Sequence, residues 1–183
     1  MVKAYTAGGA ILVMKGTLKM EGGKLYNNTA NKGGGIYVVA GGFKKLDGSG
    51  QTAKTDAKLL MSDGIVDFNT AKASEGYVSN RAGEGGGIWL GSVGNQITGG
   101  EITNNTSETK MDWGGGGIYV NNDGDLQVLN ADITNNTAYG LGGGVAGCPH
   151  AHMALSVSDG AAIHANTAYK DGYKANASAT AVG

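Results

Sequence analysis

Three carboxylates stand near equivalent points of a repeated sequence segment. Asp67 lies two residues before an asparagine, whereas Glu101 and Asp132 each lie four residues before one. If the segments stack in register, Glu101 and Asp132 become neighbours and Asp67 lies one coil away. Clustered acids could cleave a glycosidic bond or share a calcium ion in a lyase. A polysaccharide lyase or glycoside hydrolase with Asp67, Glu101 and Asp132 as catalytic residues is therefore one hypothesis, although solvated acids are common on β surfaces and the pattern sets no arginine or lysine base beside them.

A second set of residues with chemical potential is aromatic. Tyr37, Trp89 and Tyr119 each lie between two aliphatic residues, directly after a glycine cluster. Alternation along a strand sends these side chains outward, so the three rings are expected to form a column on one face. Sugar rings could stack on such a column, which makes it the best hypothesis for a ligand-binding site. The alternative is that the rings cover their own sheet or lie beneath an insertion at residues 40–58.

Candidate metal ligands are few. Cys148, His150 and His152 occupy alternate positions in an irregular segment, and His164 could join them from the following element. Zinc sites use three or four converging ligands at fixed spacing, which this segment lacks. The stretch from Asn121 to Asp125 resembles the start of a calcium loop without its downstream glutamate, so an Asp-Gly turn is favoured. We expect neither a metal ion nor another cofactor.

These residues lie within five degenerate repeats. Each repeat has an asparagine, three residues after an aliphatic residue, and successive asparagines are separated by 41, 36, 31 and 30 residues. The repeated asparagines are expected to stack as a ladder of side-chain amides, which serves the fold and leaves nothing for a ligand. The predicted ladder consists of Asn28, Asn69, Asn105, Asn136 and Asn166.

Each repeat supplies three short apolar stretches, and this arrangement predicts the fold. The in/out alternation has a period of two, and equivalent stretches recur one whole repeat later rather than after a hairpin turn. Stacking in register therefore implies parallel pairing between coils around a narrow core. The sequence predicts an all-β fold, a right-handed single-stranded parallel β-helix of about five to six short coils. One inward column would contain Ile11, Ile36, Ile88, Ile118 and Val145.

The loose period indicates insertions into an otherwise single domain. We expect one β-helix domain over residues 1–183, with loop insertions at about 40–58 and 72–84. The last repeat is irregular, so residues 146–183 are expected to form an irregular coil or cap. The chain is expected to be a fragment of a longer repeat protein. Its first residues lack the apolar core of a signal peptide, so the targeting segment of an exported protein would be missing here.

The repeat pattern resembles a known class of proteins. An apolar-x-Met-x-Gly-Gly-x-Leu-x-x-Asn-Thr-Ala segment followed by Gly-Gly-Gly-Ile-Tyr-Val is similar to the right-handed β-helix repeats of bacterial cell-surface and adhesin proteins. Large Gram-positive cell-wall proteins are the nearer resemblance, and polymorphic outer-membrane and autotransporter passenger repeats are the more distant one. The resemblance covers Gly8 to Ala168 and implies an extracellular or cell-surface location with a role in adhesion or display. The same fold also carries lyases and hydrolases.

Charge narrows the set of partners. The chain has 14 basic and 15 acidic residues spread along its length, so no basic stripe for nucleic acid is expected. No apolar run reaches the roughly 18 residues needed to cross a bilayer, so membrane insertion is not expected.

The leading hypothesis is a non-enzymatic extracellular module, an adhesin or rigid scaffold whose partner is a glycan or a host surface protein. A third hypothesis is a filament subunit that associates end to end through uncapped coils.

Overall fold

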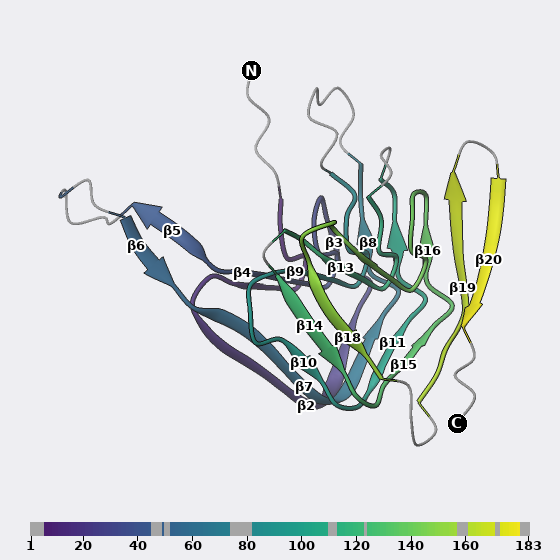
Figure 1. Ribbon diagram of the computed structural model, residues 1–183, viewed down its shortest axis with the longest axis horizontal. Coiled ribbons are helices and arrows are strands. Elements are labelled where there is room, and N and C mark those ends of the chain that lie inside the picture. The colour runs from purple at the N-terminus through teal and green to yellow at the C-terminus, as the bar shows by residue number, and fades with distance from the viewer. Residues whose placement is uncertain are drawn as a thin grey trace.

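The structure is a computed structural model that confirms the predicted parallel β-helix (Figure 1). Over the part of the chain that it describes, every regular element is a strand and no helix is long and apolar enough to cross a membrane. The described residues are 6–44, 49, 52–73, 82–109, 113–122, 124–156, 161–170 and 173–179.

One side of the helix is a parallel sheet of five strands, one from each coil. The predicted inward column is confirmed, because Ile11, Ile36 and Ile88 are register partners and the column continues to Val145. This sheet follows the glycine clusters. Its strands are β1 (Ile11–Val13), β4 (Ile36–Val39), β9 (Ile88–Gly91), β13 (Ile118–Val120) and β17 (Val145–Gly147).

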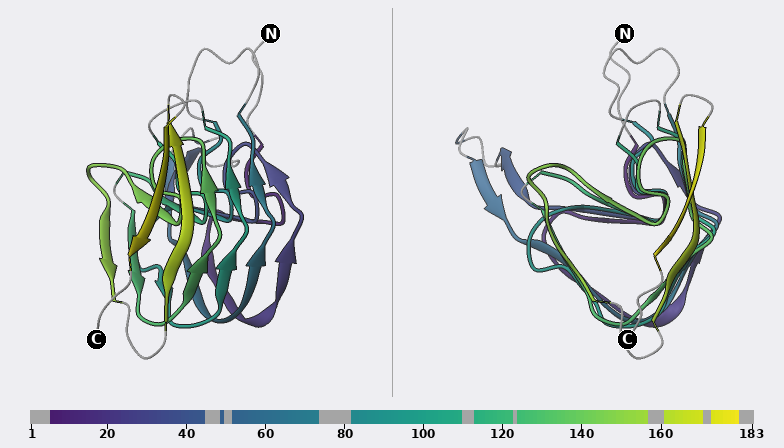
Figure 2. Two further views of the ribbon diagram at one scale, coloured as in Figure 1. Left: turned by 90° about the vertical axis from the view of Figure 1, so that its right-hand side faces the viewer. Right: turned by 45° about the vertical axis from the view of Figure 1, so that its right-hand side comes forward.

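A longer sheet folds around the other sides as two walls that meet at an angle (Figure 2, right). The first wall, called here the glutamine wall, contains the first halves of β2 (Gly16–Tyr26) and β7 (Ala57–Asp67). Its remaining strands are β10 (Gln96–Ile97), β14 (Asp125–Val128) and β18 (His152–Leu155).

The second wall, called here the threonine wall, contains the second halves of β2 and β7. Its other strands are β11 (Glu101–Thr103), β15 (Asp132–Thr134) and the start of β19 (Ile163–Lys170). Beyond the next corner each coil adds a short strand, and these are β3 (Thr29–Ala30), β8 (Thr70–Ala71), β12 (Thr106–Ser107) and β16 (Thr137–Ala138).

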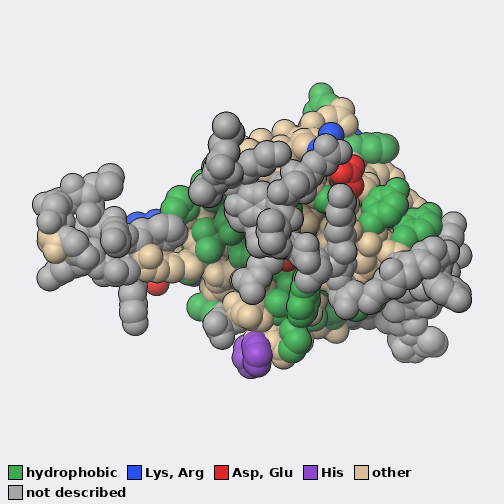
Figure 3. Space-filling view, turned by 90° about the horizontal axis from the view of Figure 1, so that it is seen from above, with side chains coloured by type: hydrophobic (Ala, Val, Ile, Leu, Met, Phe, Trp, Pro, Cys, Tyr) green, Lys and Arg blue, Asp and Glu red, His purple; other side chains and the backbone are tan. Residues whose placement is uncertain are grey.

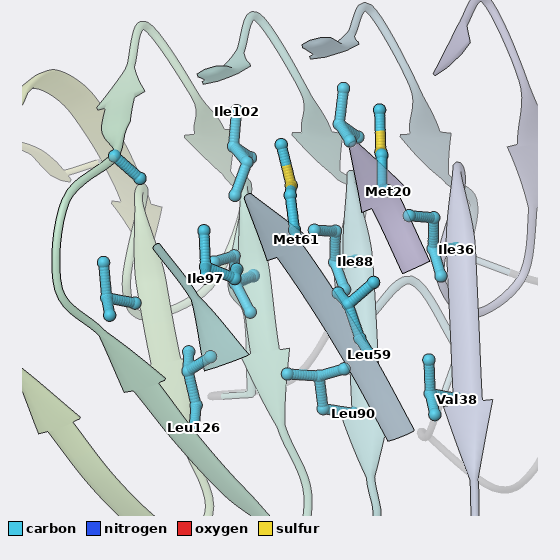
Figure 4. Packing of buried hydrophobic residues seen from close by; sticks show 14 of the residues in the cluster. Met20, Ile36, Val38, Leu59, Met61, Ile88, Leu90, Ile97, Ile102 and Leu126 are labelled. Carbon is cyan, nitrogen blue, oxygen red and sulfur yellow. The ribbon is translucent and has the colours of Figure 1, made fainter. Parts of the chain in front are cut away.

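The core fills the space between the five-stranded sheet and the two walls (Figure 4). Ile88 and Leu90 of β9 are fully buried and belong to one cluster with Ile97 of the glutamine wall and Ile102 of the threonine wall. Full burial of such a side chain contributes about 1.5–3 kcal/mol. Because every coil supplies equivalent apolar residues, the core continues along the helix axis and gives a rigid body.

Two kinds of corner allow the chain to turn between these sheets. At the glycine clusters the backbones of neighbouring coils are so close that a Cβ on Gly86 would lie 2.3 Å from the oxygen of Gly116. At the other corner the residue before each ladder asparagine has a positive φ, which asparagine tolerates better than most residues. These residues are Asn27, Phe68, Asn104, Asn135 and Ala165.

The insertions and the last coil depart from the regular pattern. The insertion predicted at residues 40–58 contains an antiparallel hairpin of β5 (Gly41–Lys44) and β6 (Thr52–Thr55), which projects from the body (Figure 1). Of the insertion at 72–84, residues 74–81 lie outside the described chain. β20 (Tyr173–Ala179) pairs antiparallel with β19 and takes the edge where a further coil would pair. The prediction of uncapped coil ends is therefore wrong along β19.

Candidate functional site

The five repeated asparagines form a continuous, mostly buried ladder. Asn105 Nδ2 donates to Asn136 Oδ1 at 3.0 Å and to the carbonyl oxygen of Val66 at 2.9 Å. Asn69 and Asn136 make equivalent side-chain bonds to the next asparagine in the series. Asn69, Asn105 and Asn136 are inaccessible to solvent. The ladder therefore satisfies polar groups of the fold and offers no ligand atoms.

The aromatic column forms in register but is covered. The rings of Tyr37 and Trp89 stack with centroids 4.3 Å apart, and those of Trp89 and Tyr119 lie 6.4 Å apart. Trp89 is only 3% exposed and Tyr119 only 1%. The prediction that these rings form an open surface for stacking sugars is therefore wrong for Trp89 and Tyr119. At Trp89 the chain before the glycine cluster places Glu84 against the ring. Among the described residues seen in Figure 3, hydrophobic side chains form separate patches rather than one row.

Polar contacts connect the residues of this aromatic column, which is mostly buried and lies outside the main hydrophobic core. Trp89 Nε1 donates to Glu84 Oε2 at 3.0 Å, and the same oxygen lies 3.2 Å from Lys32 Nζ. Lys32 Nζ also lies 5.4 Å from the centre of the Trp89 ring. At the other end of the column, the hydroxyl of Tyr119 is 2.8 Å from Cys148 Sγ. Most of these polar groups are thus used inside the protein and are not presented to a ligand.

The environment of Tyr37 predicts a loss of stability at high pH. Burial raises its pKa from 10.0 to about 12, and the nearby Glu84 carboxylate adds to the rise. Because the folded-state pKa lies above the unfolded value, this stabilising contribution is complete below pH 10.0 and is lost as the pH rises towards about 12. Urea unfolding across this range should show a shallower decline for Tyr37→Phe than for the parent chain. Parallel declines would contradict the assignment.

The three carboxylates do not converge on one point. Glu101 and Asp132 are register neighbours, as expected from the repeat. Asp67, however, is only 4% exposed, and its Oδ2 lies 2.5 Å from Lys24 Nζ. Its Oδ1 accepts from Asn104 Nδ2 at 2.9 Å. Both oxygens of Asp67 are therefore occupied, and the expectation that no lysine stands beside the acids is wrong.

The cysteine and histidines do not gather into a metal site. Cys148 is a free thiol that contacts Tyr119, whereas His150 lies in an exposed turn and His152 is exposed on β18. His164 is exposed on β19, beside Thr134 in the register. Nowhere in the described chain do three or more His, Cys, Asp or Glu side chains come close enough to hold a metal ion.

The outer face of the threonine wall and the corner directly after it carry exposed rings that sequence reasoning missed. Tyr26 is 57% exposed and Phe68 is 58% exposed, although both are large and hydrophobic. Beside them run hydroxyl, amide and carboxyl groups, and Thr134 Oγ1 donates to Thr103 Oγ1 at 3.1 Å. The sequence signal was available, since Phe68 occupies the position that is asparagine in three other repeats, Asn27, Asn104 and Asn135.

The outer face of the glutamine wall is hollowed by a groove of about 490 Å³. Gln96 and Gln127 line it as register partners, and Gln96 Nε2 donates to Gln127 Oε1 at 3.3 Å. Sequence reasoning missed the groove because it followed only the inward residues of these strands. The signal was a glutamine directly before each of the core residues Ile97 and Val128.

Comparison with known proteins adds no assignment to this geometry. No family model, no curated protein and no solved structure matches the chain.

Proposed function

We propose that this chain is a non-enzymatic extracellular binding module, whose threonine wall holds an extended polysaccharide. The resemblance of its repeats to those of surface β-helix proteins supports the location. The stacked core supports a role as a rigid display body, because each coil is fixed by its neighbours. The observation that carries the proposal is two exposed rings at one end of a polar row: Tyr26 lies in the same outward column as Thr103 and Thr134, and Phe68 follows Asp67 of that column.

Phe68 is the more informative of the two rings. Its φ is 51°, a left-handed conformation that is costly for a bulky residue. The ring is 58% exposed, so the core gains little from it. A residue that strains the backbone without stabilising the fold is best explained by what it contacts outside the protein. A sugar ring stacked on Phe68 would give the side chain that role.

The polar row supplies the other half of a carbohydrate site. Thr103 and Thr134 occupy equivalent positions on adjacent strands, which in a sheet lie about 4.8 Å apart. Glu101 and Asp132 form a second pair on the same face. Hydroxyl and carboxyl groups bind sugar hydroxyls well. Asp132 Oδ1 already accepts from Ala162 N at 3.0 Å. Because the two carboxylates would repel uronate or sulfate groups, the favoured ligand is a neutral polysaccharide.

The same geometry argues against glycoside cleavage as the main activity. A catalytic acid must reach the glycosidic oxygen, and a nucleophile must reach the anomeric carbon. Asp67 is buried between Lys24 and Asn104 and reaches neither. Glu101 and Asp132 alone form an acidic pair on an open surface. Binding without cleavage is therefore the function that this face supports best.

Phe68→Asn separates binding from stability. Asparagine tolerates the left-handed conformation, so the variant should be as stable as the parent chain or more stable by up to about 1 kcal/mol. Without the ring, its affinity for a neutral polysaccharide, measured by retardation in gels, should fall about two- to tenfold, because stacking on one aromatic side chain contributes roughly 0.5–1.5 kcal/mol.

Leu141→Asn is the matched control for this experiment. Leu141 is 53% exposed and lies outside the threonine wall, so its replacement removes a similar apolar surface without touching the proposed site. It should bind like the parent chain. Equal losses in Phe68→Asn and Leu141→Asn, or no loss in either, would refute the assignment of this face.

A further inference from the structure

The groove in the glutamine wall is a built feature with a defined floor and rim. Asp125 Oδ1 accepts from the backbone nitrogens of Gly94 at 2.7 Å and Asn95 at 3.0 Å, which fixes the rim on one side. The small residues Ala151 and Ala154 line the other side. A volume of about 490 Å³ lies within the range of small-molecule sites.

An amide ladder across this groove stops one position short. Gln96 and Gln127 are neighbours in one outward column, and the next position of that column is Ala154. Gln96 Nε2 donates to Gln127 Oε1, which leaves the Nε2 group of Gln127 as a donor that no group of the described chain accepts. Where a third glutamine would continue the ladder, the methyl group of Ala154 leaves space.

We propose that this groove binds an acetamido sugar, whose amide takes the place of the missing third side chain. The acetamido carbonyl oxygen accepts from Gln127 Nε2, and the acetyl methyl group packs against Ala151 and Ala154. The sugar hydroxyls then lie towards Asp125 and His152, which are register neighbours at the rim of the groove. This site is on a different wall from the polysaccharide site proposed above and does not depend on it.

A peptide amide fits the groove less well. Peptides that bind sheets pair their main chain with an open strand edge. The groove lies on the face of the wall, where the backbone nitrogens are already used: Gln127 N donates to Asn95 O at 3.0 Å and His152 N to Gly124 O at 2.9 Å. On this face only side chains remain to recognise a ligand, because the free edge of the described sheet runs along the far side of β18 and not across the groove. A compact ligand with one amide and several hydroxyl groups matches that set.

The test compares two disaccharides that differ only in the acetamido group. Amide chemical shifts of the intact chain are followed during titration with the β-1,4-linked disaccharide of N-acetylglucosamine and with cellobiose. The acetamido disaccharide should bind about three- to tenfold more tightly and shift the amides of β10, β14 and β18, because it alone offers Gln127 Nε2 an amide acceptor. Equal affinities, or no binding of either sugar, would overturn the proposal.

Substitutions in the groove test whether Gln127 Nε2 and the space beside Ala154 recognise the acetamido group. Gln127→Glu removes the donor with little change in shape, and Ala154→Leu fills the space, so each should reduce binding of the acetamido disaccharide at least about tenfold. Leu141→Asn lies outside both walls and outside the groove and should leave that binding unchanged. Full binding by Gln127→Glu, or equal binding of an N-acetylated dipeptide amide, would contradict the assignment. Loss of polysaccharide binding alone would bear only on the threonine wall.

Discussion

Replacement of Gly86 by alanine is expected to lower the free energy of unfolding by about 4 kcal/mol. A Cβ at this position would lie 2.3 Å from the oxygen of Gly116 and 2.5 Å from the carbonyl carbon of Thr106. Both atoms belong to the backbone of the next coil, so no side chain can move aside. The coils would have to separate locally, with loss of the bonds from Gly86 N to Gly115 O and from Gly87 N to Gly116 O.

Gly41→Ala is the control for this prediction. An added Cβ at Gly41 meets no atom within 4 Å, and the residue does not have a positive φ. Its replacement should change stability by no more than about 0.5 kcal/mol. Urea unfolding followed by circular dichroism measures both variants. Similar decreases in stability for Gly86→Ala and Gly41→Ala would show that close contact between coils is not the reason why glycine is required at Gly86.

Asn105→Ala should have the second largest effect, a loss of about 3 kcal/mol. Asn105 Oδ1 accepts from the backbone nitrogen and the Nδ2 of Asn69, and its Nδ2 donates to Asn136 Oδ1 and Val66 O. Alanine leaves the backbone N–H of Asn69 and the carbonyl of Val66 without these partners in a buried place. Each buried polar group without a partner costs about 1–3 kcal/mol.

The first asparagine of the ladder provides an internal comparison. Asn28 is partly buried, and within the described part of the chain its side chain makes one hydrogen bond, from Nδ2 to Asn69 Oδ1 at 2.9 Å. Asn28→Ala should therefore cost about 1 kcal/mol. The same denaturant unfolding measures both variants. If the ladder stabilises the fold through its buried hydrogen bonds, Asn105→Ala should lower the free energy of unfolding clearly more than Asn28→Ala does. Equal decreases would contradict this explanation.

The sequence was sufficient for the fold because its repeats report packing directly. An aliphatic residue three positions before each asparagine defined an inward column, and Leu25, Val66 and Ile102 are register partners in the structure. The glycine clusters marked corners where coils lie too close for side chains. Strand alternation then determined which residues point away from the core, including Glu101 and Asp132.

The solvent exposure of a side chain was harder to predict than the side of the sheet to which it points. Alternation correctly sent Trp89 away from the main core, but it could not show that Glu84 of a non-repeated insertion would fold against the ring. In the same way, comparison along single columns missed the contact of Lys24 with Asp67, which lie in different outward columns of adjacent strands. Contacts between columns depend on side-chain length and rotamer, which a repeat alignment does not contain.

The candidate sites were missed for a related reason. The glutamine wall was interpreted from its inward residues, so Gln96 and Gln127 received no role, and the depth of the groove depends on the small residue Ala154 one coil later. Phe68 stood in an asparagine position of the repeat, but only the structure shows that its φ is positive and its ring exposed.

Incubation of the intact chain with a panel of plant, mucosal and bacterial polysaccharides tests the central claim most directly. Mass spectrometry and sedimentation of the mixtures would follow both depletion of polysaccharide onto the protein and the release of new fragments. Binding without catalysis predicts depletion of at least one neutral polysaccharide and no new fragments. Fragments that disappear when Glu101 and Asp132 are replaced would contradict the account, and so would a failure to deplete any polysaccharide in the panel.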